Sequence, residues 1–249
     1  MDGSGTRAEG AMGEHSKSPL TKNDVLAARA RVFDDWTSRY ADWIDLGIRL
    51  HPLWGPRLRK AAAQVRGPRV LEVSFGTGYL MSLYAGRCET TGIDYNPRMI
   101  EATRRRLSRL GLDARLIEAD AHALPFADAS FDCVVNTDAF TLYRDPSRAM
   151  AEFYRVLAPG GRLVLCEYDR PADRNWLGMQ LMRMPVWLGM PAVDFDPLLR
   201  SVGFDYEDHP VGLSGVLHMF VGTKPDVDRA SRRPPQLMAS GTDAAPDQS

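Results

Sequence analysis

A short apolar run that ends in a glycine turn constrains the fold of this chain more than any other segment. Residues 69–78 read RVLEVSFGTG, so the run passes Glu72 and breaks at Gly76-Thr77-Gly78 before a helical pattern begins. Glycines let a ligand approach the backbone closely, and free N–H groups at a helix start attract anionic groups. The segment therefore predicts a strand, a ligand-binding turn with bare N–H groups, and a helix near 78–85.

A second strand supports the same interpretation. Residues 89–93 lead to Asp94, at about the 20-residue distance where a carboxylate at the next strand tip binds ribose hydroxyls. A dinucleotide site would need glycine or alanine three residues beyond the second glycine, to pack a helix under the pyrophosphate. Met81 stands there. The pattern therefore predicts a nucleoside-type ligand without a pyrophosphate.

Two later motifs follow in order, ADAHALPF at 119–126 and FDCVVNTDAF at 131–140. With the glycine turn and Asp94, they resemble the class I S-adenosylmethionine-dependent methyltransferases, in particular the ubiquinone/menaquinone-biosynthesis-like branch that acts on small molecules. The resemblance covers roughly Arg31 to Lys224. It implies S-adenosylmethionine as cofactor and a Rossmann-like, mostly parallel seven-stranded sheet with one reversed strand.

Strand and helix patterns alternate after residue 66, which predicts an α/β fold with helices on both faces of the sheet. Strands are expected near 69–74, 89–93, 114–118, 131–136, 162–167, 204–209 and 216–223, and helices near 78–85, 97–110, 147–157 and 194–202. The last two strands are separated by a connection too short for a parallel crossover, so they should be antiparallel.

Composition divides the chain into regions. Residues 1–20 and 225–249 are rich in small and polar residues, which predicts disordered tails. Apolar residues recur at helical spacing in 21–66, which predicts an N-terminal helical cover. Residues 67–224 form the expected methyltransferase domain, with a lid insertion at about 171–192.

The charge balance excludes several classes of partner. A net charge of -1 over 249 residues provides no general field for nucleic acid or an anionic membrane. Three cysteines at unrelated spacing suggest neither a disulfide framework nor a metal site. No segment resembles a signal peptide or a membrane span. We expect a cytoplasmic protein with a small-molecule acceptor; its oligomeric state is open, with a homodimer as one alternative.

The resemblance also implies roles for individual residues. Gly76 and Gly78 would bring backbone against the methionyl part of the cofactor, with Glu72 holding its ammonium group directly or through water. Asp94 would bind ribose, while Asn96 is the better cap for the helix that follows. Asp120 would accept from the adenine amino group. The expected cofactor-binding residues are Tyr40, Glu72, Ser74, Gly76, Gly78, Asp94, Tyr95, Asp120, Ala121 and Asn136.

One position departs from the family pattern. Ser74 stands where these methyltransferases usually have glycine. A small residue with φ below zero could replace that glycine and add a hydroxyl near the cofactor. A required positive φ would instead compromise the pocket. That outcome leads to one alternative function, a S-adenosylmethionine-binding regulator without transferase activity.

Acceptor recognition is assigned to apolar and aromatic segments. The insertion at 173–190 is crowded with methionine and tryptophan, which suits an adaptable apolar pocket. A helix packed on the core and an interfacial membrane contact are the other interpretations. The N-terminal cover supplies further aromatic residues. The expected acceptor-binding residues are Trp36, Phe140, Trp176, Met179, Met182 and Trp187.

Methyl transfer from a sulfonium needs alignment and exclusion of water more than acid chemistry. Should the acceptor carry a proton of high pKa, Asp138 and Tyr143 are the candidate bases; substrate orientation or loop structure is their alternative role. His122 is expected at the surface. His209 and His218, on the last two predicted strands, are weak candidates for contact with the acceptor. The predicted activity is methylation of a small, mostly apolar or aromatic metabolite in secondary metabolism, with quinone-ring C-methylation as the alternative.

Overall fold

The structure is a computed structural model that describes residues 43, 46–47, 54–171, 173–181, 183, 193–211 and 215–226. Trp36, Tyr40, Met182 and Trp187, for which roles are predicted, lie outside the described residues. So do the predicted N-terminal tail and the part of the C-terminal tail beyond Asp226.

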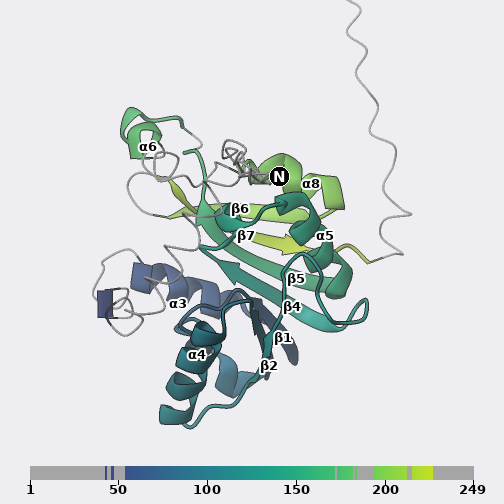
Figure 1. The fold of residues 1–249 in the computed structure, drawn as a ribbon. Helices are drawn as coiled ribbons and strands as arrows, with labels where there is room; N and C mark the ends of the chain where they lie inside the picture. Colours follow the sequence, from purple (N-terminus) through teal and green to yellow (C-terminus); the bar gives the residue numbers. More distant parts are fainter. Residues whose placement is uncertain are drawn as a thin grey trace, which may run out of the picture.

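Seven strands form one sheet (Figure 1). They are β1 Arg69–Val73, β2 Glu89–Asp94, β3 Arg115–Glu118, β4 Phe131–Thr137, β5 Leu157–Tyr168, β6 Asp205–Val211 and β7 Leu217–Thr223. Their order is β3-β2-β1-β4-β5-β7-β6, and only β7 runs opposite to its neighbours β5 and β6. The predicted mostly parallel sheet with one reversed strand is confirmed.

The helices cover both faces because the strands alternate between two buried cores. Leu71 and Val73 of β1 pack with α5 (Pro146–Val156) and α8 (Phe195–Val202). Val70 packs with α3 (Trp54–Gln64) and with α4 (Pro97–Arg109) on the other face. Figure 1 shows these helices around the sheet, with the short α6 (Trp176–Leu181) standing apart from it.

The prediction of an α-helix near 78–85 is wrong. Two 3₁₀ turns occupy the connection instead, η1 Met81–Leu83 and η2 Ala85–Arg87. Leu83, Tyr84 and Arg87 each donate to the third residue before them, at 2.9–3.1 Å. The connection to β2 is short, and Tyr84 is held at Glu72 by its hydroxyl, so the chain tightens rather than continuing as an α-helix.

β5 begins at Leu157, earlier than the predicted residue 162. Leu157 pairs with Phe131, and the register shifts between Phe131 and Cys133. Pro159, Gly160 and Gly161 therefore lie within β5, at an irregularity in its pairing with β4. Such bulges interrupt local hydrophobic alternation, which is why the pattern alone suggested a later start.

Candidate functional site

The carboxyl ends of β1, β2 and β4 meet at one edge of the sheet, where ligands bind in open α/β folds. Asp94 ends β2, Ser74 and Gly76 follow β1, and Asp138 follows β4. Local signals place them there. Asn96 caps α4 by accepting from the N–H of Arg98 at 2.9 Å, with a proline in the first turn, as predicted.

The two glycines of the turn have different functions. Gly78 has φ +68°, and a Cβ there would lie 2.5 Å from Cγ2 of Thr103, so its lack of a side chain lets α4 pack against the turn. Gly76 has φ +55°, and a Cβ there would meet nothing within 4 Å. Open space beside Gly76 is where a ligand can approach the backbone.

The N–H groups of these glycines are not bare, contrary to the expectation. The N–H of Gly78 donates to the carbonyl of Phe75 at 3.0 Å. The N–H of Gly76 donates to Oδ2 of Asp94 at 3.0 Å. Without a helix start at residue 78, the turn has no anion-binding terminus. This agrees with the absence of a pyrophosphate pattern.

Asp94 is buried, with 5% of its surface exposed. Its Oδ1 accepts from the N–H of Asn96 at 3.0 Å, while Oδ2 accepts from Gly76. The carboxylate thus joins the glycine turn to the end of β2. A carboxylate has about four acceptor sites, so hydroxyl donors can still be accommodated.

Glu72 is buried on β1, shortly before the glycine turn. The hydroxyl of Tyr84 donates to its Oε2 at 2.5 Å. Burial raises the pKa of the Glu72 carboxyl to about 8, although the hydrogen bond from Tyr84 opposes the shift. A largely neutral carboxyl engaged by Tyr84 is a poor direct partner for an ammonium group. The route through water stays a prediction.

Ser74 adopts φ +55°, so the expectation of a negative φ is wrong. A non-glycine residue in the left-handed region costs about 1–2 kcal/mol. Two hydrogen bonds hold Ser74 there. Its N–H donates to the carbonyl of Ile93 at 2.8 Å, and its Oγ lies 2.7 Å from the hydroxyl oxygen of Tyr143. The position therefore accepts serine at the expense of strain.

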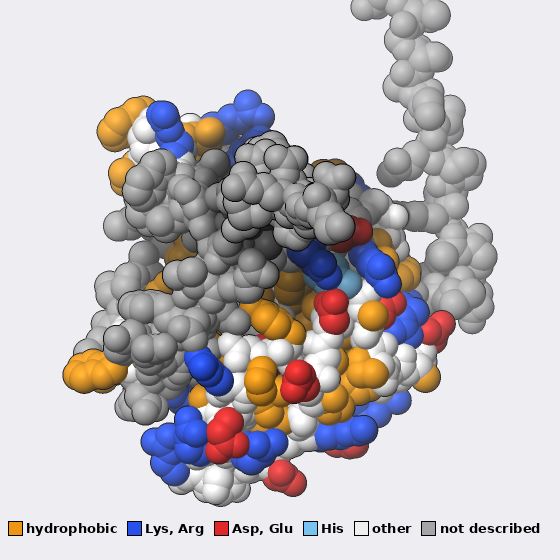
Figure 2. Space-filling model, viewed as in Figure 1, with side chains coloured by type: hydrophobic (Ala, Val, Ile, Leu, Met, Phe, Trp, Pro, Cys, Tyr) orange, Lys and Arg blue, Asp and Glu red, His pale blue; other side chains and the backbone are white. Residues whose placement is uncertain are grey.

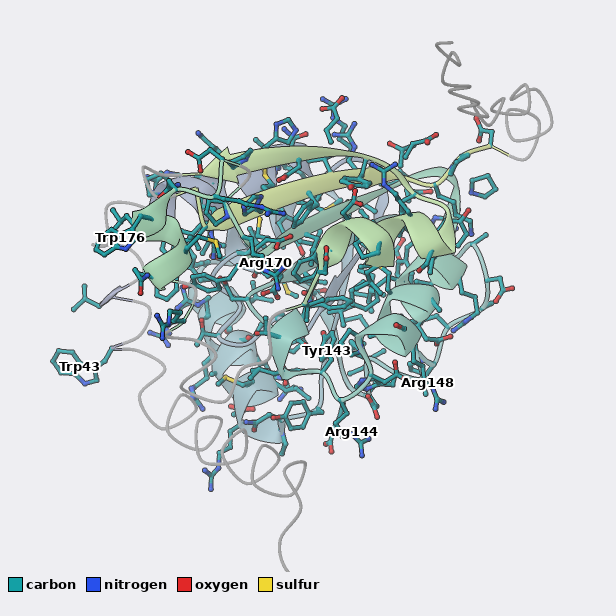
Figure 3. All side chains as sticks on the ribbon, turned by 90° about the horizontal axis from the view of Figure 1, so that it is seen from above. Trp43, Tyr143, Arg144, Arg148, Arg170 and Trp176 are labelled. Atoms are coloured by element: carbon teal, nitrogen blue, oxygen red, sulfur yellow. The ribbon has the colours of Figure 1, made fainter. Side chains whose placement is uncertain are left out.

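Tyr143 is fixed in the same network. Nδ2 of Asn136 donates to the Tyr143 hydroxyl at 2.9 Å and to the carbonyl of Val73 at 2.9 Å. Burial raises the pKa of the Tyr143 phenol well above its usual range. Both effects oppose a role for Tyr143 as a general base. They favour the alternative in which it braces the loop after β4 (Figure 3).

Asp138 has φ +54° and forms an ion pair with the guanidinium of Arg57 on α3. Arg57 is charged and nevertheless fully buried, on the helix face that also carries the core residues Leu58 and Ala61. The sequence analysis did not identify Arg57. A lone arginine on an apolar helix face was the available signal. The pair leaves Asp138 engaged, which weakens its case as a free base.

Glu167 is a second residue that the sequence analysis missed. It is fully buried at the end of β5, and Oε1 accepts from the N–H groups of Ala139 and Phe140 at 2.7 and 2.5 Å. Burial and the nearby charge of Asp138 raise its pKa to about 8. Glu167 thereby anchors the loop that follows β4.

The predicted adenine-side residues lie at the ends of β2 and β3. The Asp120 side chain is half exposed, and its Oδ1 lies 2.6 Å from Nδ1 of His122 and 2.9 Å from the His122 backbone nitrogen. His122 was expected at the surface, but its side chain is 12% exposed and its ring meets Tyr143 edge-on. Ala121 is buried, and Tyr95 is exposed.

The structure corrects one expected acceptor contact, Phe140, and places another, Trp176, at the surface. Phe140 is fully buried in the core, where its ring contacts Phe153 and Phe195, so it offers no surface to an acceptor. Trp176 is 75% exposed and projects outward from α6 (Figure 3). α6 lies at the upper left of Figure 1, and apolar and basic side chains gather in the same place in Figure 2. Met179 on the same helix is half-buried.

The histidines of the last strands differ in burial. His218 is buried on β7, and its Nδ1 lies 2.8 Å from Oδ1 of Asp208. His209 is partly exposed beside Glu207. Within the described part of the chain, no group of three or more His, Cys, Asp or Glu could hold a metal ion. Within the same ranges, no helix is long and apolar enough to cross a membrane.

Residues 71–165 match the family described as "Methyltransferase domain". Residues 71–165 therefore form a methyltransferase domain. Its cofactor is S-adenosylmethionine. The matched residues include β1, the glycine turn, Asp94 and Asn136, so this methyltransferase domain contains the site described above.

Curated relatives share part of the chain. A demethylmenaquinone methyltransferase of Thermus thermophilus is 40% identical over 121 residues, which are 47% of this chain and 55% of that protein. The ubiquinone/menaquinone biosynthesis C-methyltransferase UbiE of Klebsiella pneumoniae is 33% identical over 157 residues, 60% of this chain and 61% of that protein. The chain thus spans little more than half the length of these relatives.

Solved structures agree in fold. A methyltransferase of Thermotoga maritima, described as a possible histamine N-methyltransferase, has a TM-score of 0.61 at 22% identity, covering 79% of this chain and 99% of that one. A geranyl diphosphate methyltransferase has a TM-score of 0.59 at 16% identity, covering 70% of this chain and 79% of that one. At these identities the likeness establishes the fold of the methyltransferase domain.

The residues at the strand ends fit S-adenosylmethionine. Gly76 offers open space beside its backbone, and Asp94 offers a buried carboxylate next to it. Among the described residues, three side-chain oxygens at these strand ends are buried without a hydrogen-bond partner, namely Oδ1 of Asn136, Oδ1 of Asp138 and Oε2 of Glu167. Buried polar atoms normally have partners, so these oxygens indicate a place for the polar groups of a bound ligand.

Proposed function

We propose that this protein transfers a methyl group from S-adenosylmethionine to a small, mostly apolar or aromatic acceptor. The observation that carries the proposal is the hydrogen bond from Gly76 to Asp94, at the strand edge shared with Asn136 and Asp138. When bound, the cofactor supplies an electrophilic methyl group; its C–S bonding pair stays on sulfur as the acceptor's electron pair forms the new bond, and the acceptor then loses a proton.

The protein's own contribution is alignment and exclusion of water. Asn136 and Tyr143 brace the end of β4 against β1, and Glu167 anchors the loop after it. Neither Asp138 nor Tyr143 is a free base, since Asp138 is ion-paired and the hydroxyl of the partly buried Tyr143 is engaged by Ser74 and Asn136. We therefore favour a mechanism in which proximity supplies most of the rate.

For the acceptor we propose an aromatic ring of the quinol type, methylated at carbon. The support is that one relative is a demethylmenaquinone methyltransferase and another is a ubiquinone/menaquinone biosynthesis C-methyltransferase. Another apolar metabolite, methylated at nitrogen or oxygen in secondary metabolism, is the alternative. The cytoplasmic location and the oligomeric state stay predictions, as does the absence of a nucleic-acid partner.

A methylation assay tests this proposal. The full chain is incubated anaerobically with S-adenosylmethionine and 1,4-naphthohydroquinone, and products are identified by mass spectrometry and NMR. A C-methylated ring is the expected product. Calorimetric titration with S-adenosylhomocysteine accompanies the assay. Binding of this analogue without product from the quinol or a broader metabolite panel would favour the regulator alternative, and no binding by folded protein would reject both.

A further inference from the structure

Arg57 is a buried cation that the cofactor site does not use. It is fully buried on α3, and its Nη2 pairs with Oδ2 of Asp138. Among the described residues, its Nε and Nη1 have no hydrogen-bond partner. An unpaired buried donor costs about 1–3 kcal/mol, and more when it is charged. A guanidinium in this state is suited to bind an anionic oxygen.

The position of Arg57 separates it from the predicted cofactor contacts. The contacts predicted for ribose and adenine lie at the ends of β2 and β3, at Asp94 and Asp120, and Gly76 follows β1. Among the predicted cofactor contacts, Asn136 on β4 lies closest in sequence to Asp138, the ion-pair partner of Arg57. The ionisable groups near Arg57 are instead Asp138 after β4 and Cys166, Glu167 and Tyr168 on β5. Because β4 lies between β1 and β5, β5 is about 10 Å from β1. Arg57 therefore faces the side of the site opposite the ribose and adenine positions.

We propose that Arg57 binds an ionised hydroxyl oxygen of the acceptor, so that the acceptor class is a phenol or enol that reacts as its anion. This inference rests on the proposed methyl transfer and makes its acceptor chemistry specific. A phenolate oxygen held by a guanidinium stays beside the ring while its electron density activates the neighbouring ring carbon. Arg57 would orient the anion, and no proton transfer is assigned to it.

The carboxyl groups beside Arg57 leave room for one more anion. Asp138 supplies one carboxylate to the guanidinium. Glu167 is the other buried carboxyl beside them, and burial raises its pKa to about 8, so it is mostly protonated at pH 7. An anionic oxygen of the acceptor would supply a partner for the two guanidinium donors that lack one, Nε and Nη1.

The experiment compares two probes in the presence of saturating S-adenosylhomocysteine, using the full chain. The first, 4-methoxy-1-naphthol, carries one ionisable hydroxyl, and the second, 1,4-dimethoxynaphthalene, carries none. We expect the native protein to bind the naphthol at least about tenfold more tightly, as for a charge-assisted hydrogen bond. The preference should grow as pH rises toward the pKa of the naphthol.

Arg57→Gln should abolish this preference, and Arg57→Lys should retain part of it while preserving the charge. Arg59→Gln is the matched control, because Arg59 lies exposed on the same helix. Circular dichroism identifies any variant that fails to fold. If Arg57→Gln does not fold, the naphthol preference of Arg57→Lys and its pH dependence in the native protein test the inference. Equal affinity of the native protein for both probes would overturn the inference, and so would binding of neither.

A second titration separates acceptor binding from cofactor binding. 5′-Methylthioadenosine lacks the amino-acid part of S-adenosylhomocysteine, including its carboxylate. If Arg57 serves the acceptor, Arg57→Gln changes the Kd of both nucleosides by less than about twofold. Weaker binding of S-adenosylhomocysteine alone would instead assign Arg57 to the cofactor's carboxylate and overturn the inference. Failure of the methyltransferase proposal is distinct, since the native protein would then bind neither nucleoside.

Discussion

Oδ2 of Asp94 accepts a hydrogen bond of 3.0 Å from the backbone N–H of Gly76, across 18 residues of sequence. This contact joins the loop after β1 to the end of β2. A Cβ added at Gly76 would meet nothing within 4 Å, so open space remains beside this residue. One carboxylate thus shapes the turn and lines the space predicted for the cofactor.

Replacing Asp94 by alanine should weaken S-adenosylhomocysteine binding by roughly 1–3 kcal/mol, the cost of losing hydroxyl contacts and the support of Gly76. Isothermal titration calorimetry measures this change. Asp113→Ala is the control, because Asp113 is exposed beyond α4. Unchanged affinity in Asp94→Ala would show that the carboxylate serves only the turn.

Substituting Glu72 by glutamine should change how stability depends on pH. Burial raises the pKa of the folded Glu72 carboxyl to about 8, above its unfolded value of 4.5. The folded state therefore holds a proton that the unfolded state loses first, so this contribution is complete below about pH 4.5 and declines as pH rises to about 8. Glu72→Gln, which can still accept from Tyr84, should flatten that decline.

Urea unfolding at pH 5, 6.5 and 8 tests the Glu72 prediction. The variant should gain stability relative to the native protein as pH rises. Glu118→Gln, at an exposed position on β3, should leave the pH dependence unchanged. Parallel curves for the native protein and Glu72→Gln would mean that the Glu72 carboxyl titrates normally. Glu167 has a pKa raised in the same direction, so part of the decline should remain.

At Ser74, alanine and glycine should differ. Ser74→Ala keeps the left-handed strain at φ +55° and loses the hydrogen bond to Tyr143, so it should destabilise the fold by about 1–2 kcal/mol. Ser74→Gly loses the same bond but relieves about 1–2 kcal/mol of strain, which should bring it close to the native protein. Chemical denaturation measures both, and equal stabilities would contradict a strained Ser74.

Gly78 and Gly111 provide a matched test of close packing. Both have positive φ, +68° and +64°, but only at Gly78 would a Cβ meet Thr103, at 2.5 Å. Alanine should cost about 1–2 kcal/mol at either position for the left-handed backbone. At Gly78 an overpacking cost of about 1–3 kcal/mol should be added. Thermal unfolding compares the two variants, and a similar Tm for both would argue against the clash.

The short-range features of this protein could be read from its sequence. The order of strands and helices was predictable because apolar periodicity reflects which residues face the core. Asn96 and Pro97 marked the start of α4, since capping depends on adjacent residues. The glycine turn, Asp94 and the later motifs identified the methyltransferase domain for the same reason: each motif is a local arrangement of a few residues.

Only the tertiary structure decided the chemistry at the strand ends. Arg57 and Asp138 are 81 residues apart, and their pairing depends on how α3 packs on the sheet. The positive φ of Ser74 is set by hydrogen bonds to Ile93 and Tyr143, and Trp176 proved to project into solvent. Burial and charge are shared by distant segments, so the state of an ionisable group follows from packing that no local pattern records.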